Sequence, residues 1–337
     1  GIVKEKCIAT MARLEYGVGM LIMSDENKPA LVSEAPLWLA VRKPAGLHCT
    51  GATLTDPAAA NDHPAETLCS WVFDRWPDCA AVHGHQPGEG GLLHRLDSAT
   101  SGLVLFARTQ AAFTALDQAA ASGLFQKEYA ALCAVDGAGS FASGLEGSRP
   151  ELFAPGQLDV QHWLRLLRSG EAGRLAAVLQ NTAVSSIFRA YGKGRRRVAC
   201  AINSQLSAAV AAKWGSREYR SDILDALAVS ARLQPGAIEI DTSNAIFGPA
   251  DPELIPALLC RVRLTNGFRH QIRAHFTWQG LPLHGDQLYG STESEVSTGS
   301  RLGLHAGLLS FPDPAGGGRL AVVDTGWESF FDSGLLS

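Results

Sequence analysis

The chain carries its clearest structural signal at residues 94–107, where HRLDSATSG is followed directly by LVLFA. A polar segment ending in Thr-Ser-Gly that runs into an apolar stretch predicts a loop followed by a buried strand. Catalytic groups are often placed on such loops, and an aspartate is ionised at neutral pH, so Asp97 is a candidate nucleophile or base. The same residue types also form ordinary turns, in which Arg95 and Asp97 would simply pair at the surface.

Short strands and helices alternate irregularly around this segment. Strands are expected at 37–41, 102–107, 129–135, 219–227 and 258–264, and helices at 66–75, 110–121, 201–214 and 270–279, with one or two more between 150 and 183. This order lacks a regular strand–helix–strand repeat, which favours an α+β fold. Residues 1–35 show no clear pattern and are expected to be an N-terminal extension.

Composition indicates a globular protein with scattered thiols. The chain is 46% apolar and 18% charged, with a formal charge of −4, but it contains 22 Arg and only 7 Lys. Arginine suits two-pronged contacts with phosphates and bases, so a basic surface is compatible with a mildly acidic total. The 7 cysteines form no CxxC pair, which favours free thiols in a reducing compartment. The first residues lack a signal peptide and no run is long enough to cross a membrane, so we expect a cytoplasmic protein without a membrane partner.

Two further segments carry side chains suited to a binding site. Tyr129, in Lys-Glu-Tyr-Ala at 127–130, enters a predicted strand and can offer a flat ring to a nucleobase. A half-buried structural tyrosine has the same sequence pattern. Residues 266–275 hold two arginines and two histidines. Arg269 and Arg273 are four apart, so a helix would place both on one face, where they can meet a carboxylate or a phosphate.

Spacing within the same segment argues against a metal site. Gln271 and His275 are four apart and share a helical face, whereas His270 and His275 are five apart and do not. The sequence also lacks a P-loop and a Rossmann glycine pattern after a strand, so no metal and no nucleotide cofactor is expected.

Residues 191–197, Tyr-Gly-Lys-Gly-Arg-Arg-Arg, form the densest basic run. We interpret it as a contact for a nucleic-acid backbone, with glycine allowing close approach. A solvated loop is the alternative. The candidate residues for binding a nucleic-acid backbone are Arg95, Lys193, Arg195, Arg196, Arg197 and Arg269.

Taken in order, these segments resemble the RluA-like pseudouridine synthases. HRLDSATSG matches the family motif HRLDxxTSG, GFRHQIRAH resembles GRTHQIRVH, and LPLHGDQLYG at 281–290 resembles HPIxGDxxYG. LAVRKPAGLHC at 39–49, KEYAAL at 127–132 and LHA at 304–306 resemble further segments of the family. One departure stands out, because the family's GRT reads Gly267-Phe268-Arg269 here.

The resemblance implies an architecture and three catalytic residues. The fold would be a mixed, largely antiparallel sheet divided by a central active-site cleft, with flanking helices. Residues 36–337 would form the catalytic domain, with helical insertions near 150–183 and 201–216. Asp97 would be the catalytic carboxylate, Tyr129 would stack on the target uracil, and Arg273 would pair with Asp97. The two charged groups are far apart in sequence, so we predict an ion pair within about 4 Å across the cleft.

The implied activity is isomerisation of uridine to pseudouridine in structured RNA, either rRNA or tRNA, by a protein for which a monomer is favoured. Two alternatives belong to other classes. HRLD faintly echoes a kinase catalytic loop, but the glycine-rich loop, the VAIK-like lysine and the DFG motif are absent from the sequence. A catalytically silent RNA-binding module on the same fold is the second alternative.

Overall fold

The computed structural model describes residues 20–24, 28–51, 66–134, 145–146, 172–190, 198–202, 217–234, 237–241, 254–279, 281–289, 301–325 and 327. The helices are α1 (Leu68–Arg75), α2 (Pro77–Ala80), α3 (Gln110–Ala121), α5 (Ala172–Leu179) and α7 (Gln271–Trp278). The strands are β1 (Met20–Ser24), β2 (Ala30–Glu34), β3 (Trp38–Lys43), β4 (Ser101–Ala107), β5 (Gln126–Ala134), β6 (Leu145–Glu146), β7 (Thr182–Ala190), β8 (Val198–Ile202), β9 (Glu218–Gln234), β10 (Ala237–Asp241), β11 (Leu254–Leu264), β12 (Leu304–Pro312) and β13 (Arg319–Val323).

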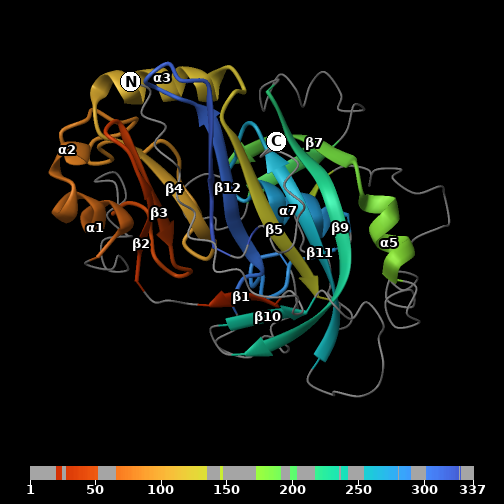
Figure 1. Ribbon diagram of the computed structural model, residues 1–337. Coiled ribbons are helices and arrows are strands. Elements are labelled where there is room, and N and C mark those ends of the chain that lie inside the picture. Colours follow the sequence, from red (N-terminus) through yellow and green to blue (C-terminus); the bar gives the residue numbers. More distant parts are fainter. Residues whose placement is uncertain are drawn as a thin grey trace.

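One mixed sheet organises the molecule (Figure 1). Its main path runs β2-β3-β4-β12-β5-β11-β9-β7-β8-β6, while β13 pairs with β12 and β10 joins β1 to β9. Among the described strands, β4 with β12 and β6 with β8 pair in parallel, and the other pairs are antiparallel. The predicted α+β fold with a largely antiparallel sheet is therefore confirmed.

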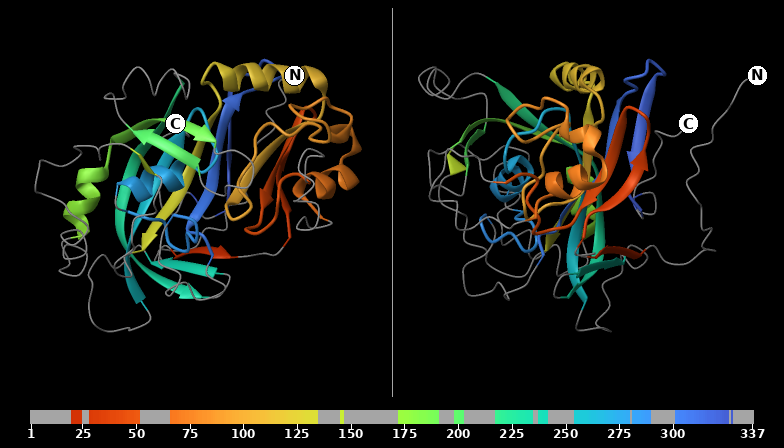
Figure 2. Two further views of the ribbon diagram at one scale, coloured as in Figure 1. Left: turned by 180° about the vertical axis from the view of Figure 1, so that it is seen from behind. Right: turned by 90° about the vertical axis from the view of Figure 1, so that its left-hand side faces the viewer.

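The strand pairing that joins the two halves of the sheet, β4 with β12, is short. β4 and β12 are joined by only two register pairs, His305 with Ser101 and Ala306 with Gly102. The β2-β3-β4 half carries the HRLDSATSG loop at the start of β4, and the other half carries α7. Leu68 and Val72 of α1 share one apolar cluster with Ile272 and Phe276 of α7. The side view accordingly shows both helices on the same side of the sheet (Figure 2).

Local sequence explains the helix starts. Thr67 caps α1 through the backbone N–H of Ser70 in a reciprocal capping box, and Thr109 caps α3 through the N–H of Ala112. α7 begins differently, after His270 in a left-handed conformation with φ of 57°. Few residues other than glycine adopt this conformation, so its presence beside the HRLD loop marks a constrained position.

Several sequence predictions differ from the structure. The region predicted as helical at 150–183 contains α5, but Thr182 begins strand β7. Residues 201–202 end strand β8, and the rest of the helix predicted at 201–216 lies outside the described residues. The extension predicted to end at residue 35 includes β2, which pairs with β3. Only three residues separate β2 from β3, and the register of the pair shifts between Leu31 and Ser33, which interrupts the alternation expected of a strand.

The start of α7 corrects one further expectation. Because the helix begins at Gln271, Arg269 precedes it and does not share a helical face with Arg273. Gln271 and His275 do share a face, since the Gln271 amide and His275 Nδ1 both hydrogen-bond to Ser221 Oγ, at 3.2 and 2.9 Å.

None of the described helices has both the length and the apolar character that a membrane span requires.

At Gly102, the parallel pairing of β4 with β12 leaves no room for a side chain. Its φ is 120°, and a Cβ atom there would lie 2.2 Å from the carbonyl oxygen of Ala306. Gly102→Ala should therefore suffer both backbone strain and a collision with β12. Gly123 is the matched control, because its φ of 72° is also positive but a Cβ meets open space. Gly123→Ala should lose roughly 1 to 2 kcal/mol from strain alone, and Gly102→Ala clearly more, measured by urea unfolding. Equal losses would contradict the steric argument.

Candidate active site

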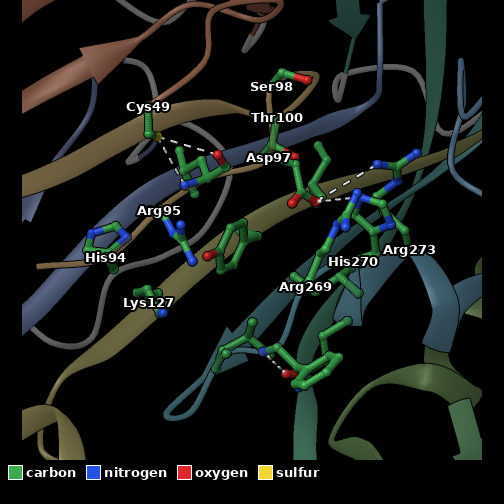
Figure 3. Close-up of a pocket in the computed structure, with 18 of the residues that line it drawn as sticks. Cys49, His94, Arg95, Asp97, Ser98, Thr100, Lys127, Arg269, His270 and Arg273 are labelled. Carbon is green, nitrogen blue, oxygen red and sulfur yellow. Dashed lines mark hydrogen bonds and ion pairs between the residues drawn. The ribbon is translucent and has the colours of Figure 1, made fainter. Parts of the chain in front are cut away.

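A large pocket opens between the HRLDSATSG loop and the chain that leads into α7. Its volume is about 1450 Å³, and its lining includes Asp97, Tyr129, Arg269 and Arg273. Pockets for drug-sized ligands measure roughly 300 to 1,000 Å³, so this one has room for more than a single small molecule. Figure 3 shows Asp97 facing His270 and Arg273 across the pocket. The structure therefore brings together the three residues predicted to be catalytic.

A buried lysine fixes the loop that carries Asp97. The ammonium of Lys43, which is fully buried at the end of β3, donates hydrogen bonds to the carbonyls of Pro44, Leu47 and Ser98 at 2.8, 2.8 and 3.0 Å. The backbone N–H of Gly46 donates to the same Ser98 carbonyl at 2.7 Å. Carbonyl dipoles thus satisfy a buried cation, and the Lys-Pro-Ala-Gly turn is tied to the residue after Asp97.

Two groups from the α7 side approach the Asp97 carboxylate. Arg273 Nη1 lies 3.9 Å from Asp97 Oδ2, and His270 Nε2 lies 3.7 Å from the same oxygen. The Asp97 side chain is one quarter exposed, whereas those of His270 and Arg273 are nearly buried. The predicted contact between Asp97 and Arg273 across the cleft is confirmed, at the long end of the ion-pair range.

Arg273 has a closer partner, which the sequence analysis missed. Its Nε and Nη2 donate to the two carboxylate oxygens of Asp286 at 2.8 and 2.7 Å, a two-pronged pair in which both side chains are buried. The backbone N–H groups of Leu288 and Tyr289 also donate to Asp286 Oδ1, at 3.0 and 3.1 Å. The sequence analysis assigned no role to Asp286, although the resemblance of its segment to GDxxYG was an available signal.

Burial and nearby charges oppose each other at Asp97. Burial raises the pKa of the carboxyl above its usual value, while the charges of Arg273, Arg269 and Lys43 counteract part of that increase. Arg273 remains a cation, because its hydrogen bond to Asp286 and the charges of Asp286 and Asp97 raise its pKa against the effect of burial. Asp97 is therefore a carboxylate that is harder to ionise than an exposed aspartate.

His270 contributes a dipole to the site. Burial, followed by the charges of Arg273 and Arg269, lowers the pKa of His270 to about 3, so the ring is neutral at neutral pH. Its Nδ1 lies 3.1 Å from the hydroxyl of Tyr289, which holds the ring beside Asp97. Sequence reasoning considered His270 only as a metal ligand and did not anticipate this position.

Tyr129 and Arg95 occupy different environments in the pocket. Tyr129 lies on β5 with only 6% of its surface exposed, and burial and the charge of Asp97 raise the pKa of its phenol. Arg95 is exposed, and its Nη1 lies 3.4 Å from Oε1 of the buried Glu89. The tyrosine is therefore a neutral ring in the pocket wall, and Arg95 lies at the surface beside Glu89.

Arg269 is an exposed residue of the pocket lining, and it is close enough for its charge to affect Asp97. The preceding Phe268 stacks on Phe188 of β7, with ring centroids 4.9 Å apart, and tilts against Tyr219 of β9 at 5.0 Å. Lys193, Arg195, Arg196 and Arg197 lie outside the described residues.

Comparisons with known proteins agree on one family. A family model described as RNA pseudouridylate synthase matches residues 38–278. The uncharacterized RNA pseudouridine synthase YjbO of Bacillus subtilis (strain 168) is 45% identical over 53 residues, which is 16% of this chain and 18% of that protein. The alignment thus spans less than one fifth of the length of this relative.

Two solved human structures are similar over much of their length. RNA Pseudouridylate Synthase Domain Containing 1 is 16% identical, covers 92% of this chain and 85% of its own, and has a TM-score of 0.48. RNA Pseudouridylate Synthase Domain Containing 4 is 14% identical, covers 87% of each chain, and has a TM-score of 0.42. The family model alone spans more than half of the 337 residues and includes Asp97, Tyr129 and Arg273. The chain therefore belongs to the RNA pseudouridylate synthase family.

Proposed function

We propose that this chain is an RluA-like RNA pseudouridine synthase that isomerises uridine in structured RNA, either rRNA or tRNA. The observation that carries the proposal is the Asp97 carboxylate, held in a large pocket 3.9 Å from Arg273. Within a family of RNA pseudouridylate synthases, a carboxylate so placed is the group best suited to act on the target nucleotide. The resemblance of residues 94–102 to HRLDxxTSG and the position of Asp97 in the pocket both support this choice.

The proposed reaction is an internal rearrangement. The bond between N1 of uracil and C1′ of ribose breaks, the base turns, and a bond forms between C5 and C1′, while C5 loses a proton and N1 gains one. The reaction is redox-neutral and its atoms balance without a cofactor. Asp97 acts as the catalytic carboxylate, and Tyr129 stacks on the uracil. A base in folded RNA must first leave its stack, which costs a few kcal/mol. Arg95 and Arg269 are proposed to bind the flanking backbone.

Arg273 orients Asp97 and favours its ionised form. Because Asp286 takes two donor groups of the guanidinium, the third nitrogen is left facing Asp97. A guanidinium bound to Asp286 through two nitrogens has little rotational freedom, so it presents a fixed positive charge to Asp97.

We further propose a monomeric, cytoplasmic enzyme, and the five free, buried cysteines among the described residues suit a reducing compartment.

Asp97→Asn tests the catalytic assignment and separates it from a silent RNA-binding module. Tritium release from RNA labelled at C5 of uridine should fall to less than a tenth of the wild-type rate, because the amide keeps the shape but lacks the charge. Affinity for RNA should remain. Asp74→Asn, on the exposed face of α1, should leave turnover unchanged. A wild-type protein that binds RNA but releases no tritium would support the silent module.

The same substitution should not weaken the fold. The folded-state pKa of Asp97 is raised, so ionisation opposes folding, and that lost stability returns as the pH falls through the raised pKa. At pH 7 the thermal midpoint of Asp97→Asn should equal or exceed that of the wild type. A lower midpoint would mean that the charge of Asp97 holds the loop in place.

Replacement of Arg273 should affect stability, rate and pH dependence together. Arg273→Ala leaves the buried Asp286 carboxylate without its partner and should cost about 3 kcal/mol or more of unfolding free energy. It also removes a charge that lowers the pKa of Asp97, so the acidic limb of the kcat profile should move to higher pH. Arg273→Lys should return the acidic limb close to its wild-type pH but recover little of the rate, because an ammonium lacks the two-pronged geometry. An unshifted limb in Arg273→Ala would contradict the electrostatic role.

The basic run at 191–197 is proposed to bind the RNA backbone. Simultaneous replacement of Arg195, Arg196 and Arg197 by Ala should weaken binding and flatten its dependence on salt by up to about one unit of log–log slope per lost phosphate contact. Lys28→Ala, an exposed single-charge control, should change the slope little. An unchanged slope in the triple variant would assign the run to a solvated loop.

A further inference from the structure

We propose that Lys127 and Arg217 form a subsite that binds a phosphate group of the RNA strand next to the target uridine. The inference rests on the proposed function, because it concerns the same pocket and the same class of substrate. The two residues are distant in sequence: Lys127 lies on β5, and Arg217 directly precedes β9. They meet at the turn formed by Asn266 and Gly267, which leads from β11 toward α7.

Lys127 is a cation of the pocket wall with no carboxylate partner in the described part of the chain. It precedes Tyr129 by two positions on β5, so both side chains lie on the pocket side of the strand, and both line the pocket. The intervening Glu128 is buried and accepts a 2.6 Å hydrogen bond from Arg261 Nε. Among the described residues, no carboxylate pairs with Lys127, and burial alone lowers the pKa of Lys127 to about 8. A half-buried ammonium that no described carboxylate neutralises favours the binding of an anion.

The Asn266–Gly267 turn brings the second cation to the same place. Lys127 Nζ lies 3.1 Å from the position that a Cβ atom on Gly267 would take, so the ammonium rests against the bare glycine. Arg217 Nη2 donates to Asn266 Oδ1 at 3.2 Å, and its guanidinium lies 5.3 Å from the ring centre of Tyr219. Arg217 also lines the pocket. Two positive charges therefore flank adjacent residues of one turn.

Donor groups without acceptors favour a phosphate over a base edge. An ammonium and a guanidinium together present only N–H donors and two positive charges, which match phosphate oxygens. A nucleobase edge carries no charge to balance them. Figure 3 shows Lys127 with His94 and Arg95 on the side of the pocket away from Asp97 and Arg273. Lys127 and Arg217 therefore share the pocket of the reacting carboxylate without adjoining it, and this is where we place the neighbouring nucleotide.

The test combines protein variants with RNA that lacks one phosphate charge. In an Asp97→Asn background, which prevents turnover, affinity is measured for substrate RNA with single methylphosphonate linkages placed in turn around the target uridine. One linkage should weaken binding about tenfold, the effect of one charge-assisted contact. Lys127→Gln should cause a similar loss with ordinary RNA, and no further loss when that linkage is neutral. Arg217→Gln, at an exposed position, should show the same coupling at that linkage.

Controls distinguish this subsite from general electrostatics and from the proposed function. Lys28→Gln removes a charge from an exposed lysine, and any small loss of affinity that it causes should be the same for every linkage. Lys127→Arg, which keeps the charge, should recover part of the affinity that Lys127→Gln loses. Losses that simply add at every linkage, or unchanged affinity in both Gln variants, would overturn the subsite. Wild-type protein that fails to release tritium from the same RNA would overturn the proposed function instead, whatever the binding results.

Discussion

One guanidinium is shared by two carboxylates, and the geometry of the site depends on that sharing. Asp286 takes the Nε and Nη2 donors of Arg273 at 2.8 and 2.7 Å, and Asp97 lies 3.9 Å from the remaining nitrogen. The tighter pair belongs to Asp286, which is itself held by two backbone N–H groups. Arg273 therefore cannot turn to form a close two-pronged pair with Asp97. The carboxylate gains a fixed positive charge while its oxygens stay available to a substrate.

The same constraint explains why the Asp97 loop needs rigid support. The two halves of the sheet meet at two register pairs between β4 and β12, and Asp97 lies on one half while Arg273 lies on the other. A shift at this seam would change the separation of the two charges directly. Gly102 allows the backbones to touch there, and Lys43 ties the Asp97 loop to the end of β3 through the Ser98 carbonyl. The buried Lys43 ammonium thus helps to fix the position of Asp97 through the backbone carbonyl of the next residue, Ser98.

Local signals in the sequence predicted the local structure well. β4 and α3 were found because an uninterrupted apolar run and an alanine-rich helical pattern each specify one element. The pairing of Asp97 with Arg273 came from the family resemblance, since no local pattern links residues so far apart. Asp286 was missed because an aspartate after glycine is typical of a turn, and its role depends on a partner 13 residues away. β7 was partly assigned to a helix because its burial comes from pairing with β9, which only the fold supplies.

The departure from the family's GRT motif has a physical explanation in the strands between Tyr129 and Arg273. Phe268, at the place of the motif's arginine, packs between aromatic side chains of β7 and β9, at 4.9 Å from Phe188 and 5.0 Å from Tyr219. An arginine at that position would bring a charge into an aromatic cluster. The next residue, Arg269, is exposed at the pocket, and the left-handed backbone of His270 then turns the chain into α7. The aromatic contacts of Phe268 fix this turn against the sheet, while Arg269 stays in the pocket lining. β7 and β9 therefore shape the site, although none of the proposed catalytic residues lies on them.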